Sequence, residues 1–310
     1  MTSQALPYIV LLGFMYGSTL VASRFSVGQF APATYIGLRL SLAALAHATI
    51  YQFSANRAWS RDRNVWQHAL LLGVIGTAVP MTSIVTALTY LSSGMASILI
   101  TINPAITVLL AHFFLHDEKL NTRKIVGIVL ALSGTALLTV RGETGLADVA
   151  KANPIGYILM FTSILLGSSS TVYARKYMRT FDAFDVASIR MLAAALAVMP
   201  LSLLLVGFDL TAVTSTGYGA LGYASLMGTF GGMMLAFYII KRFGATASAM
   251  TAYVVPIITN IGGILLLGET FTVGMLWGAL LIVVGIFILN QRRRPRTVAG
   301  ESLRAIDRVR

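Results

Sequence analysis

The clearest absences in this sequence are of cysteine and of charge. The chain has 310 residues and no cysteine, which excludes a disulfide framework, a thiolate metal site and a thiol nucleophile. Only 11% of its residues are charged, whereas a soluble globular chain carries roughly 25%. With 56% hydrophobic residues, the chain cannot cover a water-facing surface. Soluble repeat proteins are therefore excluded, and lipid is the expected solvent.

Catalytic and nucleotide-binding motifs are also missing. The sequence contains no His-Glu-x-x-His, no Gly-x-Ser-x-Gly and no phosphate-binding glycine loop. The one cluster of histidine and carboxylates, HDEK at 116–119, lies in a short connection and lacks a repeated metal-ligand spacing. We therefore expect no enzyme, no metal and no other cofactor. An ATP-driven pump would need a partner subunit.

Long apolar runs dominate what is present. A bilayer core needs about 20 apolar residues per helix, and ten such runs follow one another with short connections. We therefore predict an all-α integral membrane protein with ten transmembrane helices. The leader MTSQALP carries no positive charge, which favours a retained first helix over a signal peptide. The predicted helices cover residues 6–24, 32–51, 67–90, 94–116, 122–140, 154–174, 184–206, 217–240, 245–267 and 272–290.

The basic residues are unevenly distributed among the connections. If the amino terminus is cytoplasmic, eighteen of the 23 Lys and Arg residues lie on the cytoplasmic side. Arg24, Arg141 and Lys151 lie on the other side, and Arg39 and Arg190 fall within helices. This bias predicts a multi-pass membrane protein with both termini cytoplasmic. The net charge of +12 is then explained by topology and by anionic lipid rather than by nucleic acid.

The sequence matches itself when it is shifted by 151 residues. GLRLSLAALA from position 37 aligns with SIRMLAAALA from position 188, which places Arg39 on Arg190. EKLNTRKIVGIVLALSG aligns with ETFTVGMLWGALLIVVG, which places Glu118 on Glu269. A one-residue slip between the matched prolines leaves Asp117 as an alternative counterpart of Glu269. The predicted units are a five-helix repeat at 1–145, a second repeat at 150–291 and a basic cytoplasmic tail at 292–310.

Each repeat holds five helices, and because five is odd the second copy enters the membrane from the opposite side. Inverted repeats of this kind are common in secondary transporters, whose substrate sites lie near the midplane between the halves. We therefore predict alternating access around a central cavity, with a small-molecule substrate and membrane lipid as partners. The main alternatives are a passive channel and an integral-membrane enzyme.

The stretch INPAITV at 102–108 contains the Asn-Pro-Ala tripeptide of water and glycerol channels. Its counterpart VVPIITN keeps the proline but not the tripeptide, which disfavours a channel. A proline inside a membrane helix frees a carbonyl, which is tolerated where that carbonyl meets a polar neighbour or a wet cavity. Matched positions in the two halves therefore predict hinges beside a cavity at Pro80, Pro104, Gly232 and Pro256.

A cavity for a small amphipathic solute needs apolar walls and a few convergent polar groups. Hydroxyl, amide, methionine and tyrosine side chains gather around the predicted hinges, and Thr77 and Met233 belong to the same region. For each residue alone, ordinary helix packing is the alternative. The predicted substrate-cavity residues are Met81, Thr82, Thr101, Asn103, Met234, Tyr238, Tyr253 and Asn260.

Four charged residues recur at matched positions in the two halves. Arg39 and Arg190 lie near helix ends, where we interpret them as structural charges that cap carbonyls or reach the interface. Glu118 and Glu269 lie at helix corners, where each is expected to cap the helix that follows it. All four are therefore predicted to stabilise the fold rather than to bind substrate.

No Asp or Glu falls in the middle third of a predicted helix. A proton- or sodium-coupled carrier usually buries a carboxylate there, so we expect facilitated transport, or coupling that does not use a buried carboxylate; the alternative is a proton-coupled exporter of drug-like or other small metabolites. His47 and His112 are the titratable residues at some depth, and we interpret them as packed residues. Drug-like cations would need a buried carboxylate and nucleotide sugars would need cations in the cavity, which leaves a zwitterionic or neutral solute.

Ten helices, two five-helix repeats, an arginine early in the second helix of each, and proline followed by an acid and two glycines form a doubled pattern. In this pattern the chain resembles the drug/metabolite transporter superfamily, EamA type, from about residue 6 to 290. The resemblance is strongest to bacterial exporters of amino acids, including aromatic ones. It implies a basket of ten helices with a cavity lined mainly by the first, third, fourth, sixth, eighth and ninth. The substrate, the direction of flux, any coupling ion and the oligomeric state stay open, and a monomer is compatible with the sequence.

Overall fold

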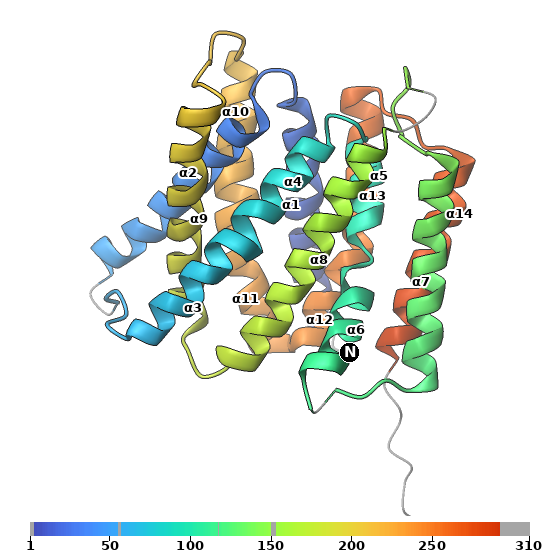
Figure 1. Cartoon of the computed structure of the whole chain (residues 1–310), viewed down its shortest axis with the longest axis horizontal. Helices are drawn as coiled ribbons and strands as arrows, with labels where there is room; N and C mark the ends of the chain where they lie inside the picture. Colours follow the sequence, from blue (N-terminus) through green and yellow to red (C-terminus); the bar gives the residue numbers. More distant parts are fainter. Residues whose placement is uncertain (1–2, 55–56, 117, 150–152, 292–310) are drawn as a thin grey trace, which may run out of the picture.

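The chain folds into a bundle of helices (Figure 1). Ten of its described helical segments are long and apolar enough to cross a membrane. The computed structural model describes residues 3–54, 57–116, 118–149 and 153–291. Within these residues all regular secondary structure is helical. The first half holds η1 (Ser3–Ala5), α1 (Leu6–Phe25), α2 (Pro32–Phe53), α3 (Arg63–Gly73), η2 (Val74–Ala78), α4 (Val79–Ala87), α5 (Ser93–Ile100), α6 (Asn103–Phe114) and α7 (Thr122–Arg141).

The second half repeats the arrangement with nearly the same lengths. It holds α8 (Pro154–Tyr177), α9 (Ala183–Leu205), α10 (Ser215–Tyr223), η3 (Ala224–Gly231), α11 (Gly232–Phe243), α12 (Ala245–Ala249), α13 (Thr251–Leu267) and α14 (Val273–Asn290). The ten apolar spans are α1, α2, α3–α4, α5–α6, α7, α8, α9, α10–α11, α12–α13 and α14. The predicted all-α membrane fold is confirmed, with the third and eighth spans starting and ending within a few residues of the predicted bounds.

The two faces of the bundle differ in charge. Both described chain ends lie on one face (Figure 1), which we call the basic face because it also carries the connections with Arg57, Lys119 and Arg179. The opposite face carries the connections after α1, α4, α7, α9 and α13. Because five spans separate each helix from its counterpart in the other half, counterparts run antiparallel.

Polar side chains fix where many helices begin. The side chains of Ser92, Asn121, Asp182 and Thr272 each accept a hydrogen bond from a backbone N–H of the helix they precede. Such caps satisfy amide groups that a helix start leaves without partners. Asn121 and Thr272 are counterparts at the shift of 151, so the caps of α7 and α14 are repeated.

Close glycine contacts join α7 to α14 at one side of the bundle (Figure 1). A Cβ atom added to Gly127 would come 2.6 Å from the carbonyl oxygen of Gly285, and a Cβ added to Gly285 would come 2.6 Å from that of Gly127. Only glycine permits this approach of two backbones, as is common where membrane helices pack. The α7–α14 pair therefore closes the two repeats onto each other.

Two spans of the first half and their two counterparts are interrupted along their length. The third and eighth spans each contain a π-helical segment, η2 and η3. The fourth span breaks at Thr101 and Ile102, just before Pro104, as expected for a proline-softened helix. The ninth span differs from the prediction, because α13 runs through Pro256 and the break lies earlier, at Met250. Asn260 Nδ2 donates to the Pro256 carbonyl at 2.7 Å, whereas the carbonyl that the proline leaves without a donor is that of Ala252, one turn earlier.

Candidate functional site

A central cavity of about 350 Å³ lies between the two halves. It takes side chains from α1, α2, the η2–α4 segment, α5, α9, the η3–α11 segment and α13. The expected lining by the sixth span is not found among the described residues, and the second and seventh spans contribute instead. The lining residues are Tyr16, Thr19, Leu20, Arg39, Gly76, Thr77, Met81, Ile100, Arg190, Met191, Gly228, Thr229, Met233 and Val255.

Two arginines reach this cavity and bond across the interface between the repeats. Arg39 Nε, on α2, donates to Thr229 Oγ1 in η3 at 2.8 Å, and Arg39 Nη1 donates to Ser23 Oγ at 3.1 Å. Arg190 Nε, on α9, donates to Thr77 Oγ1 in η2. Thr77 and Thr229 are counterparts, as are Arg39 and Arg190, so the same Arg–Thr bond is made once by each half.

The π-helical segments explain why the threonines face the arginines. Thr77 Oγ1 donates to the Leu72 carbonyl at 3.3 Å, and Thr229 Oγ1 donates to the Ala224 carbonyl at 3.1 Å. Both bonds run five residues back, to carbonyls that an ordinary α-helical turn would not present in this way. Such π segments are frequent at functional sites. In both halves the hydroxyl is held with its oxygen free to accept from a guanidinium.

Glycine beside each threonine lets the opposite repeat approach. A Cβ on Gly76 would meet Ser170 Oγ at 2.3 Å, and a Cβ on Gly228 would meet Thr19 Oγ1 at 2.0 Å. Ser170 and Thr19 are themselves counterparts. The same four-part contact of arginine, threonine, glycine and small hydroxyl residue thus occurs twice around the cavity.

The arginines lie deeper than their sequence positions indicated. We interpreted Arg39 and Arg190 as charges near helix ends, yet Arg39 is only 8% exposed and both guanidinium groups border the cavity. The side chains extend from the first third of α2 and α9 toward partners in the middle of the eighth and third spans. Neither arginine has an ion-pair partner among the described residues.

The predicted cavity residues divide into those at the cavity and those that pack helices. Met81 lines the cavity, and Thr82 and Met234 are sequence neighbours of lining residues. On the eighth span the lining methionine is Met233, the counterpart of Met81 at a shift of 152. Thr101 is buried, and its hydroxyl donates to the Ser97 carbonyl at 3.0 Å.

The two predicted asparagines join helices. Ser168 Oγ donates to both the backbone and the side-chain oxygen of Asn103, each at 3.2 Å, which ties α6 to α8. Asn260 packs against Gly94 of α5, where a Cβ would come 2.2 Å from Asn260 Oδ1. Neither side chain lines the central cavity. The Asn-Pro-Ala tripeptide does begin a half-helix, α6, but the counterpart proline lies inside the unbroken α13, so the opposed half-helices of a channel are not formed.

The two predicted tyrosines lie away from the cavity. Tyr238 is 42% exposed and packs against Tyr8 and Phe243, with ring centroids 5.2 Å and 6.3 Å away. Tyr253 OH accepts a bond of 3.4 Å from Asn290 near the end of α14. The tyrosine that lines the cavity is Tyr16. The sequence pattern missed it because its counterpart is Gly167, and only matched positions were sought.

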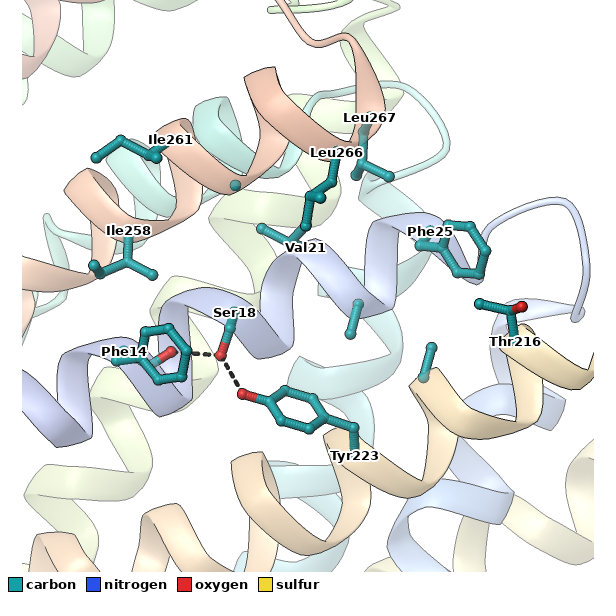
Figure 2. A pocket seen from close by; sticks show the side chains of 13 residues that line it. Phe14, Ser18, Val21, Phe25, Thr216, Tyr223, Ile258, Ile261, Leu266 and Leu267 are labelled. Atoms are coloured by element: carbon teal, nitrogen blue, oxygen red, sulfur yellow. Dashed lines mark hydrogen bonds between the residues drawn. The ribbon is translucent and has the colours of Figure 1, made fainter.

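A larger hollow of about 590 Å³ lies on the other side of α1 (Figure 2). Phe14, Val21 and Phe25 of α1 face apolar residues of α13. Ser18 Oγ donates to the Phe14 carbonyl at 2.5 Å and lies 2.7 Å from Tyr223 OH, to which it is hydrogen-bonded. Its rim includes Leu266, which is 76% exposed, so this hollow is a lateral groove open to lipid. Helix α1 separates it from the cavity, since Tyr16, Thr19 and Leu20 occupy the other side of the helix.

The lateral groove has a smaller counterpart toward the basic face. A hollow of about 320 Å³ is lined by Ser169 and Val172 of α8 and by Leu110 of α6, among others. These residues correspond to Ser18, Val21 and Ile261 of the larger groove at the shift of 151. The same groove thus occurs twice, and the copy nearer the opposite face is almost twice as large.

Matched ion pairs lie at the two faces. On the opposite face, Arg24 Nε lies 3.9 Å from Glu269 Oε1. On the basic face, Arg175 Nη1 lies 2.7 Å from Glu118 Oε1, and Lys124 Nζ lies 2.9 Å from Glu118 Oε2. Arg175 is the counterpart of Arg24 at the same shift that relates Glu118 to Glu269, which favours Glu118 as the repeat partner. Asp117 lies outside the described residues.

Glu269 caps a helix of the other repeat rather than the helix that follows it. Its carboxylate accepts from Ser93 N at 2.7 Å, Ser93 Oγ at 2.8 Å and Gly94 N at 3.2 Å, at the start of α5. The cap of α14 is Thr272. Glu118 likewise leaves the capping of α7 to Asn121, and the Lys124 hydrogen bond lowers its pKa below the ordinary value, with Arg175 adding to the effect.

The two histidines differ in depth. His47 is fully buried, with its ring 5.0 Å and 5.3 Å from those of Phe230 and Phe184 and Nδ1 3.0 Å from Ser188 Oγ. His112 lies at the basic face, where its Nδ1 is 3.3 Å from the Glu118 carbonyl. Neither lines the central cavity. Among the described residues, no three His, Cys, Asp or Glu side chains gather in a way that could hold a metal ion.

Comparisons with known proteins agree with this architecture. A solved crystal structure superposes with a TM-score of 0.64 over 98% of this chain and 99% of that chain, at 18% identity, which supports the fold. An uncharacterized transporter of Archaeoglobus fulgidus is 23% identical, covering 90% of this chain and 95% of the relative. The uncharacterized inner membrane transporter YedA of Escherichia coli is 27% identical, covering 90% and 87%.

A further relative is named for its substrate. A protein of Streptantibioticus cattleyicolor described as "Probable terminal-alkyne amino-acid exporter" is 25% identical, covering 95% of this chain and 96% of the relative. The family model for EamA-like transporters matches twice, over residues 4–140 and 154–291. These two matches correspond to the two halves described above, and the chain belongs to the EamA-like transporter family.

Proposed function

We propose that this membrane transporter exports small amino-acid-like metabolites, such as aromatic or other neutral amino acids, by alternating access. The observation that carries the proposal is the central cavity bounded by matched Arg–Thr contacts from two antiparallel halves. A substrate bound between two interchangeable halves can be exposed to either face in turn. The amino-acid exporter among the relatives supports the substrate class.

The matched grooves and ion pairs support alternation. The larger groove lies toward the opposite face and the smaller one toward the basic face, so the two halves occupy unequal positions although their sequences correspond. Arg24–Glu269 joins α1 to the end of α13, and Arg175–Glu118 joins α8 to the end of α6. We propose that each pair holds its own face closed and is released when that face opens.

The proposed orientation follows the charge difference between the faces. The basic face is cytoplasmic, both termini included, and the membrane is the bacterial inner membrane. The proposed units are the repeats at 1–145 and 150–291 with a basic tail at 292–310. Single-cysteine variants in this cysteine-free chain, one near each terminus, test the orientation. Both are expected to react with an impermeant thiol reagent in inverted vesicles and neither in intact spheroplasts.

We propose facilitated transport without proton coupling. Every acidic residue that the structure describes lies in a connection or in the first turn of a helix, so the described part of the cavity offers no carboxylate to carry a proton. The alternative is a proton-coupled exporter of drug-like or other small metabolites. Two cavity arginines disfavour its cationic substrates, because like charges repel.

Counterflow in proteoliposomes tests the proposal. Vesicles loaded with one unlabelled amino acid and diluted into a trace of its labelled form are expected to accumulate label transiently, and the initial rate is expected to saturate. Collapsing the proton gradient with an ionophore is expected to leave the rate unchanged. Linear, non-saturating flux without counterflow would indicate a channel, and strict dependence on the proton gradient would contradict facilitated transport.

A further inference from the structure

The two cavity arginines make bonds only to neutral oxygen atoms in the described part of the chain. Arg39 donates to Thr229 Oγ1 and Ser23 Oγ, and Arg190 donates to Thr77 Oγ1 and, at 2.6 Å, to the Gly76 carbonyl. A guanidinium group has five N–H donors, so these bonds orient each group without using all its donors. Hydroxyl and carbonyl dipoles hold the two planes in place and leave both positive charges uncompensated.

Two such charges within an apolar bundle are unfavourable unless a counter-charge is supplied. Charged side chains inside membrane proteins usually pair with one another or face a water-filled cavity that serves a ligand. The acids on and beside the lining helices are engaged at the faces: Asp185 of α9 accepts from Tyr51 OH near the basic face, and Glu269, in the connection after α13, accepts from Ser93 Oγ near the opposite face. The described acids therefore leave the negative charge to be brought by the occupant of the cavity.

The rest of the cavity wall describes the body of that occupant. Leu20, Met81, Ile100, Met233 and Val255 provide an apolar and adaptable surface. The volume of about 350 Å³ is at the low end of the ~300–1,000 Å³ range of ligand pockets. The site fits a small anion with an apolar side chain, and it is too small and too apolar for a nucleotide sugar.

We propose that Arg39 and Arg190 together bind the carboxylate of the substrate, and that the cavity selects small amphipathic monocarboxylates without requiring an amino group. A carboxylate has two oxygen atoms with several acceptor sites and matches the planar donors of arginine. The described cavity wall offers Tyr16 and the threonines to an ammonium group but no anion, so the amino group of an amino acid adds little. The proposal rests on the proposed function in taking this cavity as the transport site.

A matched set of three ligands tests the inference on the wild-type protein. L-phenylalanine, 3-phenylpropanoate and 2-phenylethylamine share one apolar body and differ in which charged groups they carry. Binding to the protein in nanodiscs is measured by calorimetry at neutral pH. We expect the amino acid and the acid to bind with affinities within about tenfold of each other and the amine to bind at least tenfold more weakly. An amine that binds as well as the acids, or an acid that fails to bind, overturns the proposal.

Variants of the two arginines show whether they are the carboxylate site. Arg39→Gln and Arg190→Gln are expected to weaken binding of 3-phenylpropanoate by about 10- to 100-fold, since hydrogen bonds to charged groups are the stronger ones. Arg39→Lys and Arg190→Lys retain the charge and are expected to lose less. Arg141→Gln, at the exposed end of α7, is the matched control. If a glutamine variant does not fold, its lysine variant and the ligand series still decide.

The outcome separates this inference from the proposed function. Binding of carboxylates without amino-acid counterflow would retain the carboxylate site and reject amino-acid transport. Amino-acid counterflow that is unaffected by both glutamine variants would retain the transport function and reject the arginine site.

Discussion

Glu118 and Glu269 occupy matched positions in the two repeats, yet we predict that they contribute very differently to stability. The Glu269 side chain is 5% exposed and accepts three hydrogen bonds from Ser93 and Gly94. The Glu118 side chain is 25% exposed, and its partners Lys124 and Arg175 are 23% and 42% exposed. A carboxylate that caps a buried helix start cannot be replaced by water, whereas a carboxylate among solvated cations can.

The expected magnitudes follow from these contacts. Glu269→Gln keeps one oxygen acceptor and turns the other toward backbone donors as an NH₂ group, so it loses at least one charge-assisted bond at ~1.5–3 kcal/mol and the interaction with the α5 dipole at ~0.3–1 kcal/mol. We expect a loss of ~2–4 kcal/mol in the free energy of unfolding. Glu118→Gln is expected to lose ~0–1 kcal/mol, as exposed ion pairs do.

The assay is reversible unfolding by added SDS in mixed micelles, followed through the fluorescence of the three tryptophans. The difference between the two variants is the quantity that matters, because both remove the same charge. Equal destabilisation by the two substitutions, or a larger effect of Glu118→Gln, would refute the assignment of Glu269 as a buried cap across the repeats.

Three further predictions use the same unfolding assay. Gly285→Ala is expected to lower the free energy of unfolding by ~1–3 kcal/mol, because its Cβ would lie 2.6 Å from the Gly127 carbonyl. Gly219→Ala on α10 is the control: its Cβ meets nothing within 4 Å, so it is expected to be neutral or slightly stabilising. Similar losses for both would contradict the α7–α14 contact. Thr229→Val is expected to lose ~1–3 kcal/mol by leaving Arg39 Nε without its acceptor, and Thr229→Ser is expected to retain most of that stability; a fully tolerated valine would count against the Arg–Thr bond. The pKa of Glu118 is lowered in the folded state, so the contribution of Glu118 to the free energy of unfolding, measured as wild type minus Glu118→Gln, depends on pH. It is expected to be full above the ordinary glutamate pKa of about 4.3 and to disappear as pH falls through the lowered pKa. A contribution that grows on acidification would contradict this.

The fold was accessible from the sequence because lipid imposes a simple rule on it. Every span needs a long apolar run with its backbone bonds closed internally, and all ten predicted runs correspond to observed spans. The shift of 151 also located the counterparts that later proved to make matched contacts. Arg24–Glu269 and Arg175–Glu118 obey it, although the sequence did not single out Arg24 or Arg175.

The site was less accessible because side-chain direction decides it. Met233 and Met234 are equivalent in composition, but helical geometry turns only Met233 into the cavity. The π segments add one residue to a turn, which rotates Thr77 and Thr229 toward the arginines, and no residue in VIGTA or ASLMGTFG announces that change. Arginine also has a long side chain, so a position near a helix end did not reveal that its guanidinium reaches the centre.

A single glycine explains why Glu269 reaches a neighbouring helix while Glu118 stays at the surface. A Cβ on Gly263 would lie 2.1 Å from Glu269 Oε2, so the missing side chain makes room for the carboxylate to reach α5. At the same register the first repeat has His112, whose ring lies beside the Glu118 backbone. A repeat alignment matches the two glutamates but does not show that only one has space to turn inward.

Accessibility of one cavity residue from both faces tests the central claim most directly. The chain has no native cysteine, so Met233→Cys gives a single thiol on the cavity wall. If the two antiparallel halves alternate, an impermeant thiol reagent is expected to reach this thiol from either face. A second reagent that holds one face closed is expected to abolish labelling from that face only. Labelling from one face alone under all substrate conditions would contradict alternating access through this cavity.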